Sequence, residues 1–166
     1  MDYEHFMGEA LKEAQRALGR GEFPVGCVLV HRGHVIARGS RKGTQEDGHN
    51  ELDHAEMVAL RRLAARKELR EPSGISVFST MEPCLMCFGA LMLHGIGEIV
   101  FAYEDPMGGS TSCDRSRLSP LYRESLIRVR PGVCRGDSLS LFKVFFADPR
   151  NSYWRGSYLA EYTLKQ

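Results

Sequence analysis

The sequence predicts an α/β fold in which helices cover a layered sheet. Short runs rich in β-branched and aromatic residues alternate with stretches of helical period. The first two such runs are joined by the turn pair Arg32-Gly33, which predicts an antiparallel hairpin. The later runs are separated by helical stretches, and this order predicts parallel strand–helix–strand units with right-handed crossovers.

The first half of the chain supplies a helix, the hairpin and a second helix. Apolar residues share one helical face over 2–18, and Gly19 and Gly21 end that helix. The expected elements that follow are strands at 25–31 and 35–37, a polar loop at 41–52 and a helix from about 54 to 67.

The second half continues the alternation of strands and helices. The run after Pro72-Ser73-Gly74 is strand-like and leads directly into Glu82-Pro83-Cys84. The expected elements are strands at 75–79, 98–102 and 126–129, helices at 84–93 and 138–146, and a loop at 103–118. The helix at 84–93 is apolar almost all round, which predicts that it is buried or lies at an interface.

Composition limits the class of protein. The 166 residues are expected to form one domain, 1–166. A net charge of +1 does not point to a nucleic-acid partner. The five cysteines are an odd number, and three of them, Cys27, Cys113 and Cys134, are scattered, which favours a reduced, cytoplasmic protein. No apolar run approaches a membrane span, and the acidic start has no signal-peptide pattern, so we expect no membrane partner.

Two short motifs carry the chemistry: Asp53-His54-Ala55-Glu56 and Glu82-Pro83-Cys84-Leu85-Met86-Cys87. His54, Cys84 and Cys87 supply three zinc ligands, which leaves a fourth position for water, as in catalytic zinc sites. Asp53 is the expected N-cap of one helix and Pro83 fits the first turn of the other. The positive ends of both helices would then favour thiolates at the metal.

Glu56 is the expected proton carrier. Two thiolates cancel the formal charge of Zn²⁺ and weaken it as a Lewis acid, so a nearby carboxylate that moves protons becomes more necessary. A lone Cys-x-x-Cys also fits a redox pair, and a lone His-x-Glu also fits a solvated helix face. Together, and with the proline in place, the motifs are the signature of zinc nucleobase deaminases.

The sequence resembles the cytidine/deoxycytidylate deaminase superfamily, and most closely its tRNA adenosine deaminase and guanine deaminase branch. The resemblance covers about residues 3–146. It is densest in four segments: Phe23-Pro24-Val25-Gly26-Cys27, His54-Ala55-Glu56, the run from Ser79 to Ala90, and the run from Asp105 to Ser110. It implies a three-layer fold with a five-stranded mixed sheet, one zinc per chain and a homodimer.

The resemblance also implies which residues contact the substrate. The branch usually has an Asn that touches the substrate after its second strand; here Arg41 stands in that place, and Asn50 is a second candidate for the contact. The full set of expected substrate-binding residues is Val25, Gly26, Cys27, Arg41, Asn50, Met81, Glu82, Pro83 and Asp105.

The sequence leaves the substrate open. Hydrolytic deamination of adenosine in tRNA is the first choice, because the runs after Glu82 and Asp105 are so similar to that branch. A free base or nucleoside of the guanine, cytosine or cytidine type is the alternative, since tRNA binding needs many phosphate contacts and the usual basic tail is missing. An inactive nucleic-acid-binding relative is a remote third. The aromatic tail, 147–166, is expected to pack on or near the site; a base-stacking platform is the other interpretation.

Overall fold

A five-stranded mixed sheet forms the centre of the protein. The computed structural model describes residues 1–45, 48–66 and 71–166. The strands lie in the order β2-β1-β3-β4-β5. Their bounds are β1 Gly26–His31, β2 His34–Ser40, β3 Ile75–Met81, β4 Glu98–Tyr103 and β5 Arg128–Arg130.

Strand directions agree with the sequence pattern. β1 runs antiparallel to both β2 and β3, whereas β3, β4 and β5 are mutually parallel. The hairpin between β1 and β2 turns at Arg32 and Gly33, whose φ angles are 49° and 77°, values that suit the tight turns of twisted hairpins. The predicted α/β fold with a five-stranded mixed sheet is therefore confirmed.

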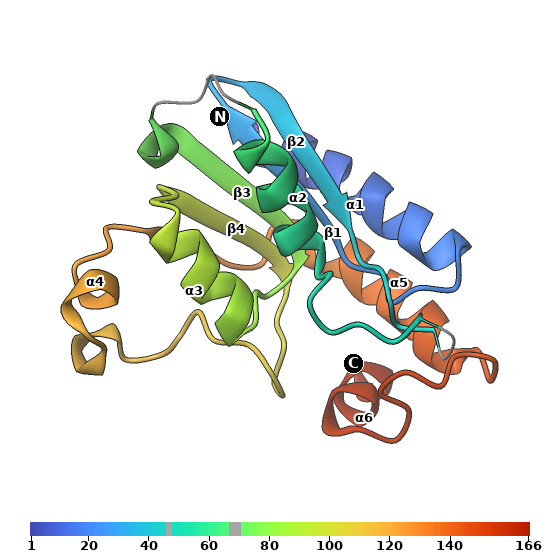
Figure 1. Ribbon diagram of the computed structural model, residues 1–166. Helices are drawn as coiled ribbons and strands as arrows, with labels where there is room; N and C mark the ends of the chain where they lie inside the picture. The colour runs from blue at the N-terminus through green and yellow to red at the C-terminus, as the bar shows by residue number, and fades with distance from the viewer. Residues whose placement is uncertain (46–47, 67–70) are drawn as a thin grey trace.

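Helices cover both faces of this sheet. α2 and α3 lie on one face, and α1 and α5 lie on the other (Figure 1). The helices are α1 Tyr3–Gly19, α2 Ala55–Ala64, α3 Leu85–Leu93, α4 Pro120–Arg123, α5 Arg135–Ala147 and α6 Tyr158–Lys165, with short 3₁₀ turns at Pro72–Gly74 and Arg115–Arg117. Within the described ranges, no helix is long and apolar enough to cross a membrane.

Close backbone approach fixes the layer that carries the site. A Cβ added at Gly39 of β2 would lie 2.0 Å from the carbonyl oxygen of Ala55, the first residue of α2. Only glycine allows a helix to sit so near a strand. The start of α2, and with it His54, is thereby held against the sheet.

The helix starts differ in detail from the sequence prediction. His54, not Asp53, is the N-cap of α2, because the Asp53 carboxylate is bonded instead to Arg61 and to the Asn50 amide. α2 ends at Ala64; the last predicted residue, Lys67, lies outside the described ranges. At α3 the N-cap is Cys84, so Pro83 stands one position before the N-cap and outside the first turn.

The last predicted elements are also displaced. β5 lies at Arg128–Arg130, because Arg115 donates to the carbonyls of Ser125 and Ile127 and keeps the preceding segment irregular. α5 begins at Arg135, three residues before the predicted start. The helix α6 had no predicted bounds; it packs on α5, and Thr163 shares a 3.0 Å hydrogen bond with Tyr103 of β4.

Candidate active site

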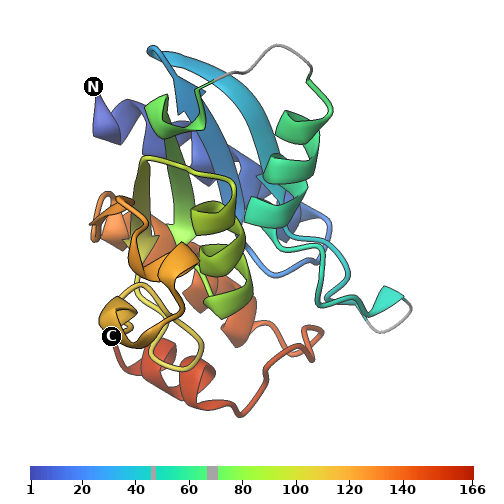
Figure 2. The same ribbon diagram turned by 60° about the vertical axis from the view of Figure 1, so that its left-hand side comes forward.

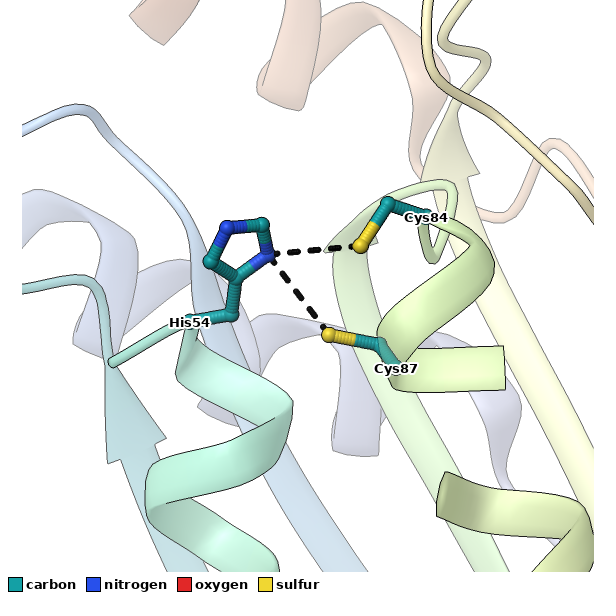
Figure 3. A group of neighbouring side chains, drawn as sticks. All are labelled: His54, Cys84 and Cys87. Atoms are coloured by element: carbon teal, nitrogen blue, oxygen red, sulfur yellow. Dashed lines mark hydrogen bonds between the residues drawn. The ribbon is translucent and has the colours of Figure 1, made fainter. Parts of the chain in front are cut away.

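The two motifs meet where α2 and α3 begin. His54 and Cys84 are the N-cap residues of these helices, and Cys87 lies in the first turn of α3. Figure 3 shows the His54 imidazole pointing from the start of α2 toward both sulfurs. Residues far apart in the sequence thus converge on one point at the end of the sheet.

The three side chains fit a zinc ion. His54 Nδ1 lies 3.6 Å from Cys84 Sγ and 3.6 Å from Cys87 Sγ. All three candidate ligand atoms lie within 4.8 Å of one another. A tetrahedral metal at about 2.3 Å from sulfur and about 2.0–2.1 Å from nitrogen would separate N and S by about 3.6 Å. One imidazole and two thiols are also the donor types that zinc prefers.

Without metal, the two thiols differ in acidity. Hydrogen bonding from Cys87, together with His54, lowers the pKa of Cys84 to about 4, even though burial opposes this shift. The same contact with Cys84 and then burial raise the pKa of Cys87. Burial lowers the pKa of His54, but the Cys84 sulfur and the Glu56 carboxylate outweigh it and raise that pKa overall. Of the two thiols, Cys84 is therefore the one whose thiolate form is favoured.

Glu56 lies beside these ligands on the first turn of α2. It is only 3% exposed, and burial raises the pKa of its carboxyl. Its Oε1 accepts a 2.9 Å hydrogen bond from Ser79 Oγ, and its Oε2 accepts a 3.6 Å hydrogen bond from Cys87 Sγ. A carboxyl with a raised pKa holds a proton more readily than a free one and can still release it, as a proton shuttle must.

A cavity of about 430 Å³ opens over this group and has room for a nucleobase. Its walls come from both motifs, the β1 and β3 ends, the loop after β4 and the C-terminal segment. The lining residues are Phe23, Val25, Arg41, Glu51, His54, Ala55, Glu56, Met81, Glu82, Cys84, Asp105, Met107, Gly108, Tyr153, Trp154 and Leu159.

Five of the nine expected substrate-binding residues line this cavity: Val25, Arg41, Met81, Glu82 and Asp105. The other four are Gly26, Cys27, Asn50 and Pro83. Gly26 packs against α1, where an added Cβ would lie 2.1 Å from the Ala10 carbonyl oxygen, and Cys27 is fully buried in the core.

Asn50 and Pro83, the remaining two, form hydrogen bonds that stabilise loops beside the cavity. The Asn50 side chain donates to Asp53 and accepts from the Leu52 amide, so its polar atoms serve the loop before α2. The Pro83 carbonyl accepts bonds from the amide and hydroxyl of Ser110. Both residues support the walls of the site from outside the cavity.

Glu82 and Asp105 organise the loop after β4. Glu82 accepts from the Asp105 amide and from the amide and hydroxyl of Thr111. Asp105 Oδ1 accepts from the amides of Met107 and Gly108, each at 2.9 Å. The carboxylates therefore fix the loop that forms one wall of the cavity.

Sequence reasoning missed several lining residues: Phe23, Glu51, Met107, Gly108, Tyr153, Trp154 and Leu159. Phe23 and Met107 lie inside segments that resemble the deaminase superfamily, so their positions in the sequence could have indicated that they line the cavity. The aromatic tail that contains Tyr153 and Trp154 is expected from the sequence to pack on or near the site, but neither residue is in the expected substrate-binding set. The structure places that segment across the end of the sheet where α2 and α3 begin (Figure 2).

Comparison with known proteins agrees with this geometry. Residues 1–103 match the family model of the cytidine and deoxycytidylate deaminase zinc-binding region. The chain belongs to this deaminase family. It is therefore a zinc-dependent hydrolytic deaminase that uses one zinc ion, and the His54, Cys84 and Cys87 cluster is the candidate site for that ion.

Individual relatives of this deaminase are known. It is 31% identical over 146 residues to a tRNA-specific adenosine deaminase of Streptococcus pyogenes serotype M18, covering 88% of this chain and 91% of the relative. It is 33% identical over 150 residues to the tRNA-specific adenosine deaminase of Bacillus subtilis, covering 89% and 90%.

Solved structures show the same fold. A tRNA:A34 deaminase structure, from a study of adenosine-to-inosine editing at the wobble position of transfer RNA, has 30% identity and a TM-score of 0.64. The match covers 82% of this deaminase and 98% of that chain. A guanine deaminase from Nitrosomonas europaea gives a TM-score of 0.69 at 22% identity, covers 86% of this chain and 83% of that one, and supports the fold alone.

Proposed function

We propose that this deaminase hydrolyses the exocyclic amino group of a nucleobase at the His54, Cys84 and Cys87 cluster, with adenosine in a tRNA as the first candidate substrate and inosine as the product. One observation carries the assignment of the site. The two sulfurs lie 3.6 Å from His54 Nδ1, and a buried carboxyl, Glu56, faces the same cavity. Relatives with more than 30% identity that are named tRNA-specific adenosine deaminases support the substrate.

The residues divide the work as follows. His54, Cys84 and Cys87 would hold the zinc ion, which when bound supplies a Lewis acid that lowers the pKa of water towards about 7. Glu56 takes a proton from the water that attacks the ring carbon bearing the amino group. It delivers this proton to the adjacent ring nitrogen, then takes the second proton of the former water from the new carbon-bound hydroxyl and passes it to the departing nitrogen. The carbon–nitrogen bond breaks, ammonia leaves and the ring keeps the oxygen.

The cavity walls orient the base for this attack. Val25, Phe23 and Met81 supply apolar surface, and all three are at most 7% exposed. Arg41 and Asp105 supply polar edges on other walls. A flat ring held between apolar walls, with polar groups at its rim, is the general arrangement of small-molecule sites. We assign these five residues to substrate binding.

A free base or nucleoside is the second candidate substrate. The C-terminal segment brings Tyr153, Trp154 and Leu159 onto one wall of the cavity, and a wall of this kind encloses a small substrate and excludes water. The net charge of +1 also gives little general attraction for a polyanion. An inactive nucleic-acid-binding relative is disfavoured, because Glu56 and all three candidate ligands are present together.

Ammonia release from a panel of substrates separates these candidates. The panel contains free bases, nucleosides and a tRNA anticodon stem-loop. Deamination of the stem-loop adenosine, weakening steeply with added salt, supports the first candidate. Fast release from guanine, cytosine or a nucleoside, with the stem-loop inert, replaces it by the second. No release from any member contradicts the proposed function.

A homodimer is part of the proposal. Phe88 and Met92 of α3 are buried within the chain, but Leu85 and Leu93 of the same helix are 66% and 62% exposed. Nearby α4 adds Leu121, also 62% exposed. A second copy related by a two-fold axis would cover this apolar surface.

Sedimentation tests the dimer. Wild-type protein should sediment as a dimer at micromolar concentration, and Leu93→Glu should sediment as a monomer. Leu164→Glu, at a position on α6 that is 53% exposed, is the matched control and should remain a dimer. A wild-type monomer would remove this part of the proposal.

The remaining assignments are a single domain and a reducing compartment. The sheet is built from strands spread over residues 26–130, α5 packs on it, and α6 packs on α5, which supports a single domain. All five cysteines are free, which supports the cytoplasm as the location.

A further inference from the structure

Arg41 lies at the centre of a polar cluster on the cavity wall. The residue is 2% exposed, which is rare for a charged side chain without a partner. Its guanidinium donates to the carbonyls of Lys42 and Asn50, to Glu51 Oε2 at 2.8 Å and to Tyr153 Oη at 3.3 Å. Both terminal nitrogens of the buried guanidinium therefore have protein partners, and these come from two distant parts of the chain.

The contact with Tyr153 ties the C-terminal segment to the cavity. Tyr153 Oη donates to Glu51 Oε2 at 2.9 Å, across 102 residues of sequence. Its ring lies 5.6 Å from the Arg41 guanidinium and 5.4 Å from the Phe23 ring. The next residue, Trp154, has φ of +55°, a left-handed backbone that is strained for a bulky side chain. Both aromatic residues line the cavity.

Glu51 connects this cluster to the candidate metal site. Its Oε2, the same oxygen that meets Arg41 and Tyr153, lies 3.7 Å from His54 Nε2. Because His54 Nδ1 faces the two sulfurs, Nε2 is the outer nitrogen of the ring. Histidines that bind metals usually donate this second N–H to a carboxylate, which fixes the orientation of the ring. The other Glu51 oxygen lies 3.4 Å from His49 Nε2.

We propose that Glu51 and Arg41 are positioning residues that hold the His54 ring and, through Tyr153, fasten the C-terminal segment as the aromatic wall on which the nucleobase stacks. This inference rests on the proposed function. It assigns no proton transfer to either residue. It predicts that one carboxylate couples two properties of the site, the affinity for zinc and the affinity for a flat heteroaromatic ring.

Different substitutions test the effect on zinc affinity and the effect on substrate affinity separately. Glu51→Gln removes the charge facing His54 and weakens the bond to Arg41, so zinc affinity should fall by about 10–100-fold and KM should rise. Tyr153→Phe removes only one hydroxyl, so KM should rise by about tenfold while kcat and zinc affinity stay unchanged. Arg41→Lys keeps the charge but loses the fork that reaches both partners, and its KM should also rise.

Three measurements test the proposal on the full-length protein. Competition with a chromophoric chelator gives zinc affinity, steady-state kinetics separates KM from kcat, and amide hydrogen exchange reports opening of residues 153–159. Exchange there should be faster in Glu51→Gln and Tyr153→Phe. Matched controls are Glu161→Gln and Tyr158→Phe, whose side chains lie on α6 and do not line the cavity.

Defined results overturn the proposal. If Glu51→Gln binds zinc as tightly as wild type, Glu51 does not position His54. If exchange over 153–159 is unchanged in both variants, the cluster does not fasten the segment. If Tyr153→Phe lowers kcat at constant KM, Tyr153 acts in the chemistry instead. Zinc affinity and exchange need no turnover, so they decide the inference even if no substrate is deaminated; should Arg41→Lys not fold, the other two variants decide it.

Discussion

Replacing Glu56 by Gln should nearly abolish turnover without disturbing the fold or the metal. The side chain is 3% exposed and accepts from Ser79 Oγ at 2.9 Å. Gln has the same shape and keeps an acceptor for Ser79. Because burial raises the pKa of the Glu56 carboxyl, its charged form is disfavoured in the folded state, and a neutral side chain there should not lower stability.

The size of the effect follows from the role. Losing a positioned acid–base group costs about 10²–10⁴ in rate, or about 2.7–5.5 kcal/mol of transition-state stabilisation. Ammonia release under single-turnover conditions measures this loss on protein with known zinc content. Glu161→Gln, at an exposed position on α6, is the control and should react like wild type. A zinc-loaded Glu56→Gln variant with activity within tenfold of wild type would show that another group moves the protons.

Three further outcomes are expected. In protein stripped of metal, the Cys84 thiol, with a pKa of about 4, should react with iodoacetamide at pH 6 while Cys87, with a raised pKa, stays unmodified; equal labelling would contradict this order. Bonding to Arg135 lowers the pKa of Glu104 from 4.5 to about 2, so its stabilisation is complete above pH 4.5 and is lost as the pH falls through 2. Glu104→Gln should therefore lower the free energy of unfolding at pH 7 and much less at pH 3, as denaturant titrations at both pH values will show. Phe142→Ala should cost about 3–5 kcal/mol in the same titrations, because the ring is fully buried against Phe23 and Tyr103; a cost below about 1 kcal/mol would contradict the packing.

The sequence was sufficient to find the candidate metal cluster, because each of its two motifs is local and the two together form a recognised signature. Cys84 and Cys87 stand three residues apart at a helix start, so their sulfurs share one side whatever the rest of the chain does. His54 and Glu56 are two residues apart at the start of α2, so one short stretch of backbone sets their relative placement. Strand directions could also be predicted, since a two-residue turn forces an antiparallel pair and a helical crossover favours a parallel one.

The remaining walls of the cavity depend on long-range contacts. The position of Glu51 in a polar loop predicts a solvated carboxylate. Only the fold brings it into contact with Arg41 and with Tyr153, which lies 102 residues further along the chain. Arg41 in the place of an expected Asn indicated a changed site, but not that the guanidinium is buried. The Asp53 cap was expected from its position alone, and a competing bond to Arg61 decided otherwise. Local propensity cannot rank such competitors.

Metal analysis tests the central claim most directly. Wild-type protein and Glu56→Gln, purified without added metal, should each contain close to one zinc per chain, because His54, Cys84 and Cys87 are intact in both. Cys87→Ser should contain almost none. A wild-type protein without zinc, in which Cys84 and Cys87 form a disulfide, would contradict the account and favour a redox protein.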